Sequence, residues 1–254
     1  MNPSEIARQF QRDGYAAPLD ILTAQEVQLY RDAYDRLEAD RKTKGISARP
    51  TQQHLVYKPF WDLATHPRVL EIMKAVIGSD IVLIATGFFA KAPGECEKYV
   101  AWHQDTTYWG LEPPFAATVW IAIDDSDREN GCLRVIPGTH HALLPHGKAD
   151  KAGNILGNNQ EIDPALIDES KAIDLELTAG QASLHHGMAV HGSNPNRSGR
   201  RRCGMTLRFT TPDVKPVAGV FVDKPILLCG EDRYGHFEYL PKPAFANQAE
   251  PSLR

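Results

Sequence analysis

The chain has 254 residues, a hydrophobic fraction of 42% and a formal net charge of −4 at pH 7. This balance is typical of a globular protein and gives no general attraction to nucleic acid or to an anionic membrane surface. The longest apolar run, IVLIATGFFA, is far shorter than the ~18 residues of a membrane span, so we expect no membrane association.

The N-terminal stretch MNPSEIARQF carries charged residues where a secretory signal would have its apolar segment. A disulfide framework is not expected in a chain of this length, and no CxxC pair is present. The four cysteines are instead widely spaced, at Cys96, Cys132, Cys203 and Cys229. We therefore predict a cytoplasmic protein, and the sequence leaves its oligomeric state open.

The first 80 residues are predicted to be largely helical, with helices over residues 1–45. LTAQEVQLYRDAYDRLEADR begins with a capping box, in which Thr23 is the N-cap and Glu26 follows three residues later. THPRVLEIMKAVIG has apolar residues at helical spacing and ends on Gly78, a typical helix stop.

From residue 81 the sequence changes to short β-branched and aromatic runs separated by Gly, Pro, Asn and Asp. These runs are DIVLIATGFFAKAPG, AATVWIAIDD, GCLRVIPGTHH, QASLHHGMAVHGS and CGMTLRFTTP. Several such strands in succession indicate a β-sandwich or jelly roll. We predict one domain over residues 1–254, with a helical part at about 1–80, a jelly-roll core at about 81–215 and a C-terminal extension at 216–254.

The strand pattern is interrupted by a polar excursion over residues 145–172. An irregular segment of this length in a compact domain is often a lid or a binding element. A solvated insertion explains the composition equally well, and the sequence leaves both alternatives open.

The segment AWHQDTTYW contains two candidate metal ligands, His103 and Asp105. In a strand, residues i and i+2 point to the same side, so both would project from one face while Gln104 points to the other. One more histidine would complete a facial triad of two histidines and a carboxylate, which leaves positions open on Fe(II). A polar turn between two strands is the alternative interpretation of the same residues.

Several histidines compete for the third position, and the run SLHHGMAVHGS supplies three of them. His185 and His191 share strand parity in this run, whereas His186 does not. His191 differs from the others because Arg202 follows it in VHGSNPNRSGRRR, at the start of the alternating strand RCGMTLRF. Arg202 and Arg208 face one side of this strand, and a buried arginine there needs an anionic partner, which the dicarboxylate 2-oxoglutarate would supply.

Three ordered blocks, WHQDTTYW, VWIAIDDSDRENGCLRVIPGTHH and VHGSNPNRSGRRR, resemble the signature blocks of the phytanoyl-CoA dioxygenase family of Fe(II)- and 2-oxoglutarate-dependent oxygenases. The resemblance covers most of residues 6–212. It implies a mainly β fold with flanking helices around a double-stranded β-helix (jelly-roll, cupin-like) core. It also implies that His103, Asp105 and His191 bind iron, that Arg202 binds the distal carboxylate of 2-oxoglutarate, and that Ser193 and Trp120 line the cosubstrate pocket.

The resemblance further implies a reaction that uses Fe(II), 2-oxoglutarate and O2 and releases succinate and CO2. Halogenating relatives carry Gly or Ala at the position of Asp105, so the carboxylate favours hydroxylation or a related oxidation over chlorination. We expect a small, polar substrate, with Tyr108 and Trp109 as candidate walls of its pocket. Arg208 would bind either an anionic group of the substrate or an acidic side chain such as Asp124 or Asp125.

Two other functions are compatible with parts of the sequence. A non-enzymatic jelly-roll binding module explains the strands but not the ordered His103, Asp105, His191 and Arg202. A zinc hydrolase could use the same three metal ligands, but it leaves Arg202 without a role.

Overall fold

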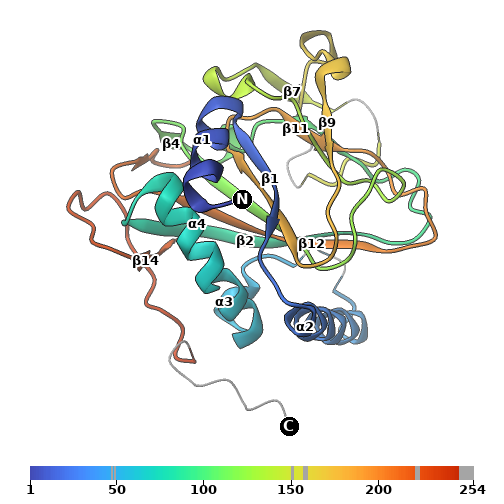
Figure 1. The fold of residues 1–254 in the computed structure, drawn as a ribbon, viewed down its shortest axis with the longest axis horizontal. Coiled ribbons are helices and arrows are strands. Elements are labelled where there is room, and N and C mark those ends of the chain that lie inside the picture. The colour runs from blue at the N-terminus through green and yellow to red at the C-terminus, as the bar shows by residue number, and fades with distance from the viewer. Residues whose placement is uncertain (47, 49, 150–151, 157–159, 221–223, 246–254) are drawn as a thin grey trace.

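The computed structural model describes residues 1–46, 48, 50–149, 152–156, 160–220 and 224–245, apart from the side chain of residue 108. Two antiparallel sheets stack face to face, in the predicted jelly-roll arrangement (Figure 1). The larger sheet has the order β1 (Tyr15–Asp20), β10 (Gln181–His186), β5 (Ala117–Ala122), β12 (Arg202–Thr210), β2 (Ile81–Lys91) and β14 (Ile226–Cys229). The smaller sheet has the order β3 (Val100–His103), β11 (His191–Ser193), β6 (Leu133–Val135) and β9 (Ile173–Leu175).

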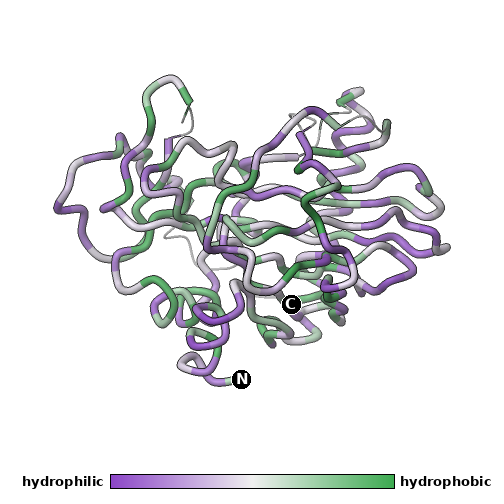
Figure 2. Tube along the Cα trace, turned by 90° about the horizontal axis from the view of Figure 1, so that it is seen from above, coloured by the Kyte–Doolittle hydropathy of each residue, from purple (hydrophilic) through white to green (hydrophobic). Residues whose placement is uncertain are grey.

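The α-helices lie together on the outer side of the larger sheet (Figure 1). They are α1 (Pro3–Asp13), α2 (Ala24–Thr43), α3 (Lys58–Ala64) and α4 (Pro67–Ile77). Both the capping box of α2 and the glycine that ends α4 are as predicted. Hydrophobic stretches run through the middle of the strands, whereas the loops at their ends are largely hydrophilic (Figure 2). Among the described residues, no helix is long and apolar enough to cross a membrane.

Short elements join these layers. The 3-10 helices are η1 (Gln53–Leu55), η2 (Asp105–Tyr108), η3 (Thr139–His141), η4 (Pro164–Leu166) and η5 (Glu169–Lys171). Two small ribbons pair β4 (Leu111–Glu112) with β13 (Lys215–Pro216) and β7 (His146–Lys148) with β8 (Gln160–Ile162). The second ribbon lies in the polar excursion, of which residues 150–151 and 157–159 are outside the described part.

The N-terminal part is less helical than predicted, because β1 separates α1 from α2. Gly14 adopts a φ of 78°, which ends α1 in a left-handed conformation that suits glycine. The next six residues extend and pair with β10, so that they form one edge of the larger sheet. The prediction of helices throughout residues 1–45 was wrong because this short edge strand, with its single proline, has no strong strand signal of its own.

The C-terminal extension also contributes a strand to the core. β14 lies within the predicted extension at 216–254, yet it pairs with β2 and forms the other edge of the larger sheet. Ile226 and Leu228 are buried there. Residues beyond the predicted core boundary therefore help to complete the sheet.

β12 has the alternation predicted from RCGMTLRF. Cys203, Met205 and Leu207 pack into the core formed with the helices. Arg202 and Arg208 point to the opposite side, into the space between the two sheets. One strand therefore supplies both the floor of a pocket and part of the hydrophobic core.

Candidate active site

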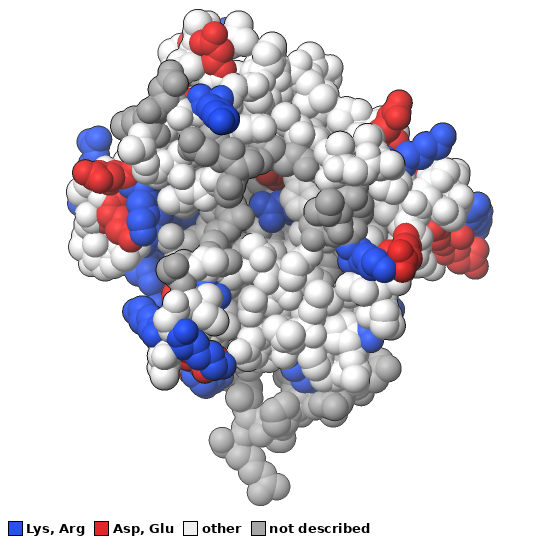
Figure 3. Space-filling model, turned by 180° about the vertical axis from the view of Figure 1, so that it is seen from behind, with Lys and Arg blue, Asp and Glu red and all other residues white. Residues whose placement is uncertain are grey.

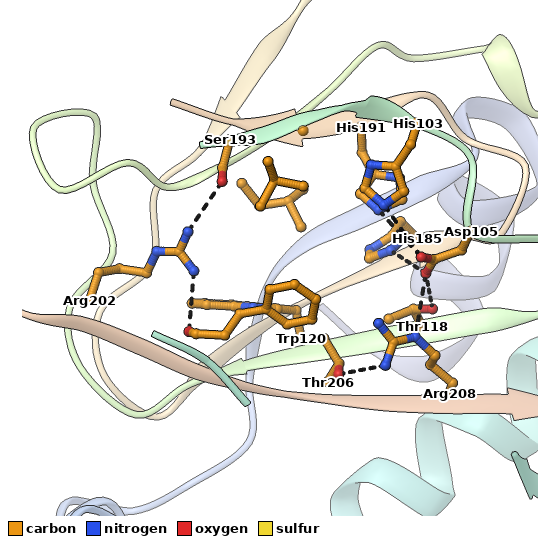
Figure 4. A pocket seen from close by; sticks show the side chains of 14 residues that line it. His103, Asp105, Thr118, Trp120, His185, His191, Ser193, Arg202, Thr206 and Arg208 are labelled. Atoms are coloured by element: carbon orange, nitrogen blue, oxygen red, sulfur yellow. Dashed lines mark hydrogen bonds and ion pairs between the residues drawn. The ribbon is translucent and has the colours of Figure 1, made fainter. Parts of the chain in front are cut away.

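A pocket lies between the two sheets and is lined by residues from both (Figure 4). Its lining is Phe89, Val100, His103, Asp105, Thr118, Trp120, Leu133, His185, His191, Gly192, Ser193, Arg202, Thr206 and Arg208. Each of the predicted iron and cosubstrate residues is in this set. The face of the molecule opposite to Figure 1 is hollowed near its centre, with basic and acidic atoms visible inside the hollow (Figure 3).

Two histidines meet across neighbouring strands of the smaller sheet. His103 at the end of β3 is the direct partner of His191 at the start of β11, and their ring centroids are 4.1 Å apart. Asp105 Oδ1 lies 3.5 Å from Nε2 of His103 and 4.0 Å from Nε2 of His191. One ligand atom from each of the three buried residues lies within 4.8 Å of the other two, close enough to share one metal ion.

The backbone orients both imidazole rings. Nδ1 of His103 lies 2.8 Å from the carbonyl oxygen of Ala101, and Nδ1 of His191 lies 2.9 Å from that of Ala189. In each pair Nδ1 is the donor, which leaves the lone pair on Nε2 directed at the other ligands. Burial, with the nearby His103, holds the pKa of His191 well below its usual range, so this ring is neutral and able to bind a metal.

The backbone conformation that brings the Asp105 carboxylate to the histidines differs from the predicted one. β3 ends at His103, and Asp105 begins the 3-10 helix η2, so the two residues are not i and i+2 of one strand. Gln104 does point away, as predicted. Its side chain binds the carbonyls of Ala142 and Met188 and holds the loops behind the site.

The run SLHHGMAVHGS also differs from the prediction, because it forms two strands in two sheets. His185 belongs to β10 in the larger sheet, and His191 belongs to β11 in the smaller one. The two rings face each other across the pocket with centroids 4.3 Å apart. Strand parity therefore has no meaning between them, and a turn between sheets brings both to the site.

The two oxygens of Asp105 have different surroundings. Oδ1 faces the two histidines, whereas Oδ2 accepts a 3.0 Å hydrogen bond from Thr118 Oγ1. Nε2 of His185 and Nε of Arg208 lie 3.6 and 3.7 Å from Oδ2. Burial alone would raise the pKa of Asp105, but Arg208 and the histidines hold it well below its usual range. The carboxylate is therefore ionised and held on one side, with the other oxygen available to a metal.

The positions of Thr118 and His185 beside this carboxylate were not predicted from the sequence. Thr118 is one position in the apolar strand β5, with no local signal of a polar function. His185 was considered only as a rival for His191. In the described part of the chain neither of its ring nitrogens has a hydrogen-bond partner, although the residue is 1% exposed.

The other end of the pocket contains two buried basic side chains beside Ser193. Arg202 donates two hydrogen bonds to the carbonyl of Gly131, at 3.1 and 2.8 Å, and a 3.3 Å bond to Ser193 Oγ. Lys91 donates a 2.6 Å hydrogen bond to the same hydroxyl and another to the carbonyl of Asn194. Within the residues that the structure describes, neither side chain forms an ion pair with a carboxylate.

Burial disfavours the charge on both side chains. It lowers the pKa of Arg202 to about 10, so the guanidinium is still protonated at neutral pH. It lowers the pKa of Lys91 to about 6, with a further contribution from Arg202. A buried arginine without an acidic partner is unfavourable unless an anion binds, so this end of the pocket is suited to a carboxylate.

Trp120 forms the wall beneath Arg202, whose Cζ lies 5.3 Å from the ring centroid. The ring occupies space left by the glycine on β12, because a Cβ at Gly204 would lie 2.1 Å from Trp120 Cζ2. The predicted pocket residues Trp120 and Ser193 thus lie on two sides of the Arg202 guanidinium.

Arg208 does not have the acidic partner predicted for it. Asp124 instead binds Arg31 and Arg201 on the outside of the sheet, and Asp125 accepts a hydrogen bond from the backbone of Ala179. Arg208 faces Asp105, which the sequence could not place beside it. This alternative was wrong because both aspartates lie beyond the end of β5, where Asp124 faces Arg31 of α2.

Rings flank the Arg208 guanidinium. Its Cζ lies 5.2 Å from the Trp109 ring centroid and 5.9 Å from that of Phe89. Trp109, a predicted substrate wall, is therefore next to the pocket. The side chain of the other predicted wall, Tyr108, lies outside the described residues.

Residues 10–204 match the family model described as "Phytanoyl-CoA dioxygenase (PhyH)". Among curated proteins, the chain is 24% identical over 211 residues to a "Probable alpha-ketoglutarate-dependent hypophosphite dioxygenase" of Stutzerimonas stutzeri, covering 82% of this chain and 69% of that protein. It is 27% identical over 242 residues to an "Ectoine dioxygenase" of Nocardia farcinica (strain IFM 10152), covering 85% and 81%. Among solved structures it resembles the apo form of the non-heme monooxygenase ThoJ, with a TM-score of 0.75, 31% identity and coverage of 94% and 88%.

Proposed function

The chain belongs to the phytanoyl-CoA dioxygenase family, and we propose that it is an Fe(II)- and 2-oxoglutarate-dependent oxygenase that hydroxylates a small, polar metabolite or natural-product intermediate. One observation carries this proposal. Two imidazole nitrogens and one carboxylate oxygen converge in a buried pocket whose other end contains Arg202 and Lys91, neither with a carboxylate partner among the described residues. A metal and a dicarboxylate together account for both ends.

His103, Asp105 and His191 are the proposed iron ligands. Two neutral nitrogen donors and one carboxylate on the same side match the ligand set of non-haem Fe(II) oxygenases. When bound, Fe(II) with 2-oxoglutarate and O2 supplies the oxidising chemistry, and succinate and CO2 are the co-products. The carbonyls of Ala101 and Ala189 keep both rings in the tautomer that binds metal through Nε2.

Arg202 is the proposed partner of the distal carboxylate of 2-oxoglutarate. Its planar guanidinium can form two parallel hydrogen bonds with a carboxylate, and Ser193 Oγ lies beside it as a further donor. Lys91 adds a positive charge to this end when it is protonated. Trp120 covers the guanidinium and keeps water from one side of it.

Hydroxylation is proposed over halogenation because Asp105 occupies the third ligand position. Thr118, His185 and Arg208 surround Oδ2 and fix the carboxylate there. Replacing Asp105 with glycine should therefore abolish hydroxylation and open a position for chloride or azide on the metal. A small, polar substrate is supported by the names of two relatives, which are described as dioxygenases of hypophosphite and of ectoine.

An anaerobic titration tests the proposal. The full chain with Fe(II) should give a weak visible charge-transfer band on addition of 2-oxoglutarate, and the band should be absent with succinate. A zinc hydrolase or a binding module with structural histidines would give no band. A substrate screen scored by succinate release and product mass would then identify the hydroxylated compound.

A further inference from the structure

The two arginines of β12 lie too far apart to bind one small ligand. They are six residues apart on the strand, and at about 3.3 Å per residue their Cα atoms are separated by roughly 20 Å. In Figure 4 they lie at opposite ends of the pocket, with the candidate metal ligands nearer to Arg208. A 2-oxoglutarate whose distal carboxylate binds Arg202 therefore leaves Arg208 available to another ligand.

Some N–H donors of the Arg208 guanidinium have no acceptor among the described residues. Nη1 donates a 2.8 Å hydrogen bond to Thr206 Oγ1. Nε is buried without a hydrogen-bond partner in the described part of the chain, because Asp105 Oδ2 at 3.7 Å is beyond hydrogen-bond distance. No hydrogen bond of Nη2 to a described residue is present either. The rings of Trp109 and Phe89 limit where a partner can approach.

When the metal and 2-oxoglutarate are both bound, no negative charge remains in the site to balance the positive charge of Arg208. When Asp105 binds a divalent metal through Oδ1, the metal already offsets its single negative charge. Of the two negative charges of 2-oxoglutarate, one would be balanced by the metal and the other, on the distal carboxylate, by Arg202. Apart from Lys91, which lies beside Arg202 and Ser193 at the other end, the pocket then carries one positive charge more than its negative charges, and that charge is on the 8% exposed Arg208. A buried guanidinium in this state is stabilised by an anion.

We propose that Arg208 binds an anionic group of the substrate, a carboxylate or a phosphoryl oxyanion, and thereby places the reacting carbon or phosphorus beside the metal. This inference rests on the proposed function, because it concerns the space that 2-oxoglutarate leaves open. Trp109 and Phe89 form the walls that orient the planar guanidinium toward this anion. The substrate class is therefore small oxyanions rather than neutral or wholly apolar molecules.

Binding of matched probes to the Fe(II)–2-oxoglutarate complex of the full chain tests the inference. Propionate, methylphosphonate and the neutral isostere propionamide are titrated anaerobically into the saturated complex. The readouts are the charge-transfer band and the tryptophan fluorescence, to which Trp109, whose ring lies next to the guanidinium, contributes. We expect at least one anion to bind about tenfold more tightly than propionamide, and the preferred anion indicates whether the group is a carboxylate or a phosphoryl oxyanion.

Three variants assign the effect to Arg208. In Arg208→Gln, anion affinity should fall about 10- to 100-fold, the range expected for loss of a charged hydrogen-bond partner, while the band still forms. Arg208→Lys should retain part of the preference for anions over propionamide, because lysine keeps the positive charge but lacks the paired N–H donors of the guanidinium. Arg134→Gln is the matched control, since Arg134 also stacks on a tryptophan, at 5.2 Å from Trp102, but lies outside this pocket.

The outcomes are separable. Equal binding of propionamide and both anions by the wild type overturns the inference. Unchanged anion affinity in Arg208→Gln also overturns it, because the anion then binds the metal directly. Loss of the band in a folded Arg208→Gln would also overturn it, because Arg208 would then only support Asp105. If Arg208→Gln does not fold, the anion affinity of Arg208→Lys and the comparison of probes in the wild type test the inference instead. A wild type that never forms the band refutes the proposed function itself.

Discussion

The two ends of the pocket contain the same residue type on the same strand, yet their surroundings differ. Arg202 binds carbonyl and hydroxyl oxygens and has no carboxylate partner in the described residues, whereas Arg208 lies 3.7 Å from the carboxylate of Asp105. The Arg202 end is therefore incomplete without an anion. The Arg208 end is electrostatically satisfied when the metal is absent and becomes short of negative charge only when Asp105 binds a metal. Alternation along one strand thus places two buried arginines in the pocket with different electrostatic surroundings.

Removing one of the three proposed metal ligands should have the largest effect, because we expect it to disable both ends of the pocket. In His103→Ala, Asp105→Ala or His191→Ala we expect iron affinity to fall more than about 100-fold. Mutating residues that only hydrogen-bond to metal ligands typically lowers metal affinity ~10–100-fold. Iron content after gel filtration and the charge-transfer band measure this loss. His141→Ala, which removes an exposed histidine, is the control. Full iron retention in the three variants would show that the cluster is not the metal site.

Arg202→Lys should weaken 2-oxoglutarate binding about 10- to 100-fold, since lysine cannot reproduce two parallel hydrogen bonds to a carboxylate. Anaerobic titration of the band gives the affinity, and the full band should return at saturating 2-oxoglutarate. Arg200→Lys is the control, because Arg200 binds Asp127 and Glu129 at the surface. Similar effects in both variants would indicate a general basic patch instead of a specific carboxylate site.

Thr118→Val should affect the metal end alone. It removes the 3.0 Å hydrogen bond to Asp105 Oδ2 with almost no change in volume, and we expect iron affinity to fall by about tenfold. The affinity for 2-oxoglutarate at saturating iron should stay near that of the wild type. Thr210→Val, which removes a hydrogen bond to the carbonyl of Phe115 elsewhere on β12, is the matched control. An equal loss in both variants would attribute the effect to the sheet and not to Asp105.

The smallest predicted effect is the uptake of a proton by Lys91, beside Arg202, when 2-oxoglutarate binds. Because burial lowers the pKa of Lys91 to about 6, the native chain lacks a proton that the unfolded chain holds up to a pKa of about 10.4. The contribution of Lys91 to stability should therefore rise with pH across this window. A bound carboxylate would raise the pKa of Lys91, so 2-oxoglutarate binding should take up as much as one proton and weaken as pH rises.

Calorimetry at pH 8 in buffers of different ionisation enthalpy measures this proton. Lys91→Met should take up correspondingly less than the wild type, and its stability should change less steeply between about pH 6 and pH 10. Equal proton uptake by the two proteins would mean that Lys91 does not respond to the ligand.

The sequence predicted the residues of the candidate site and much of the architecture. The ordered His103, Asp105, His191 and Arg202 predicted a metal and an anion site, and the structure brings all four residues to one pocket. The alternation of β12 correctly assigned its polar residues to the pocket and its apolar residues to the core. Both inferences depend on residue type and local period, which the sequence displays directly.

Which side chains come into contact depends on the tertiary structure. It placed Asp105 on a 3-10 turn, separated His185 and His191 into two sheets, and brought Lys91 to Ser193 and Arg208 to Asp105. Lys91 and Ser193 are 102 residues apart, and Arg208 and Asp105 are 103 apart. Strand alternation specifies the face on which a side chain lies, but its partner across the pocket depends on sheet stacking and register, which are set by long-range pairing that no local pattern encodes.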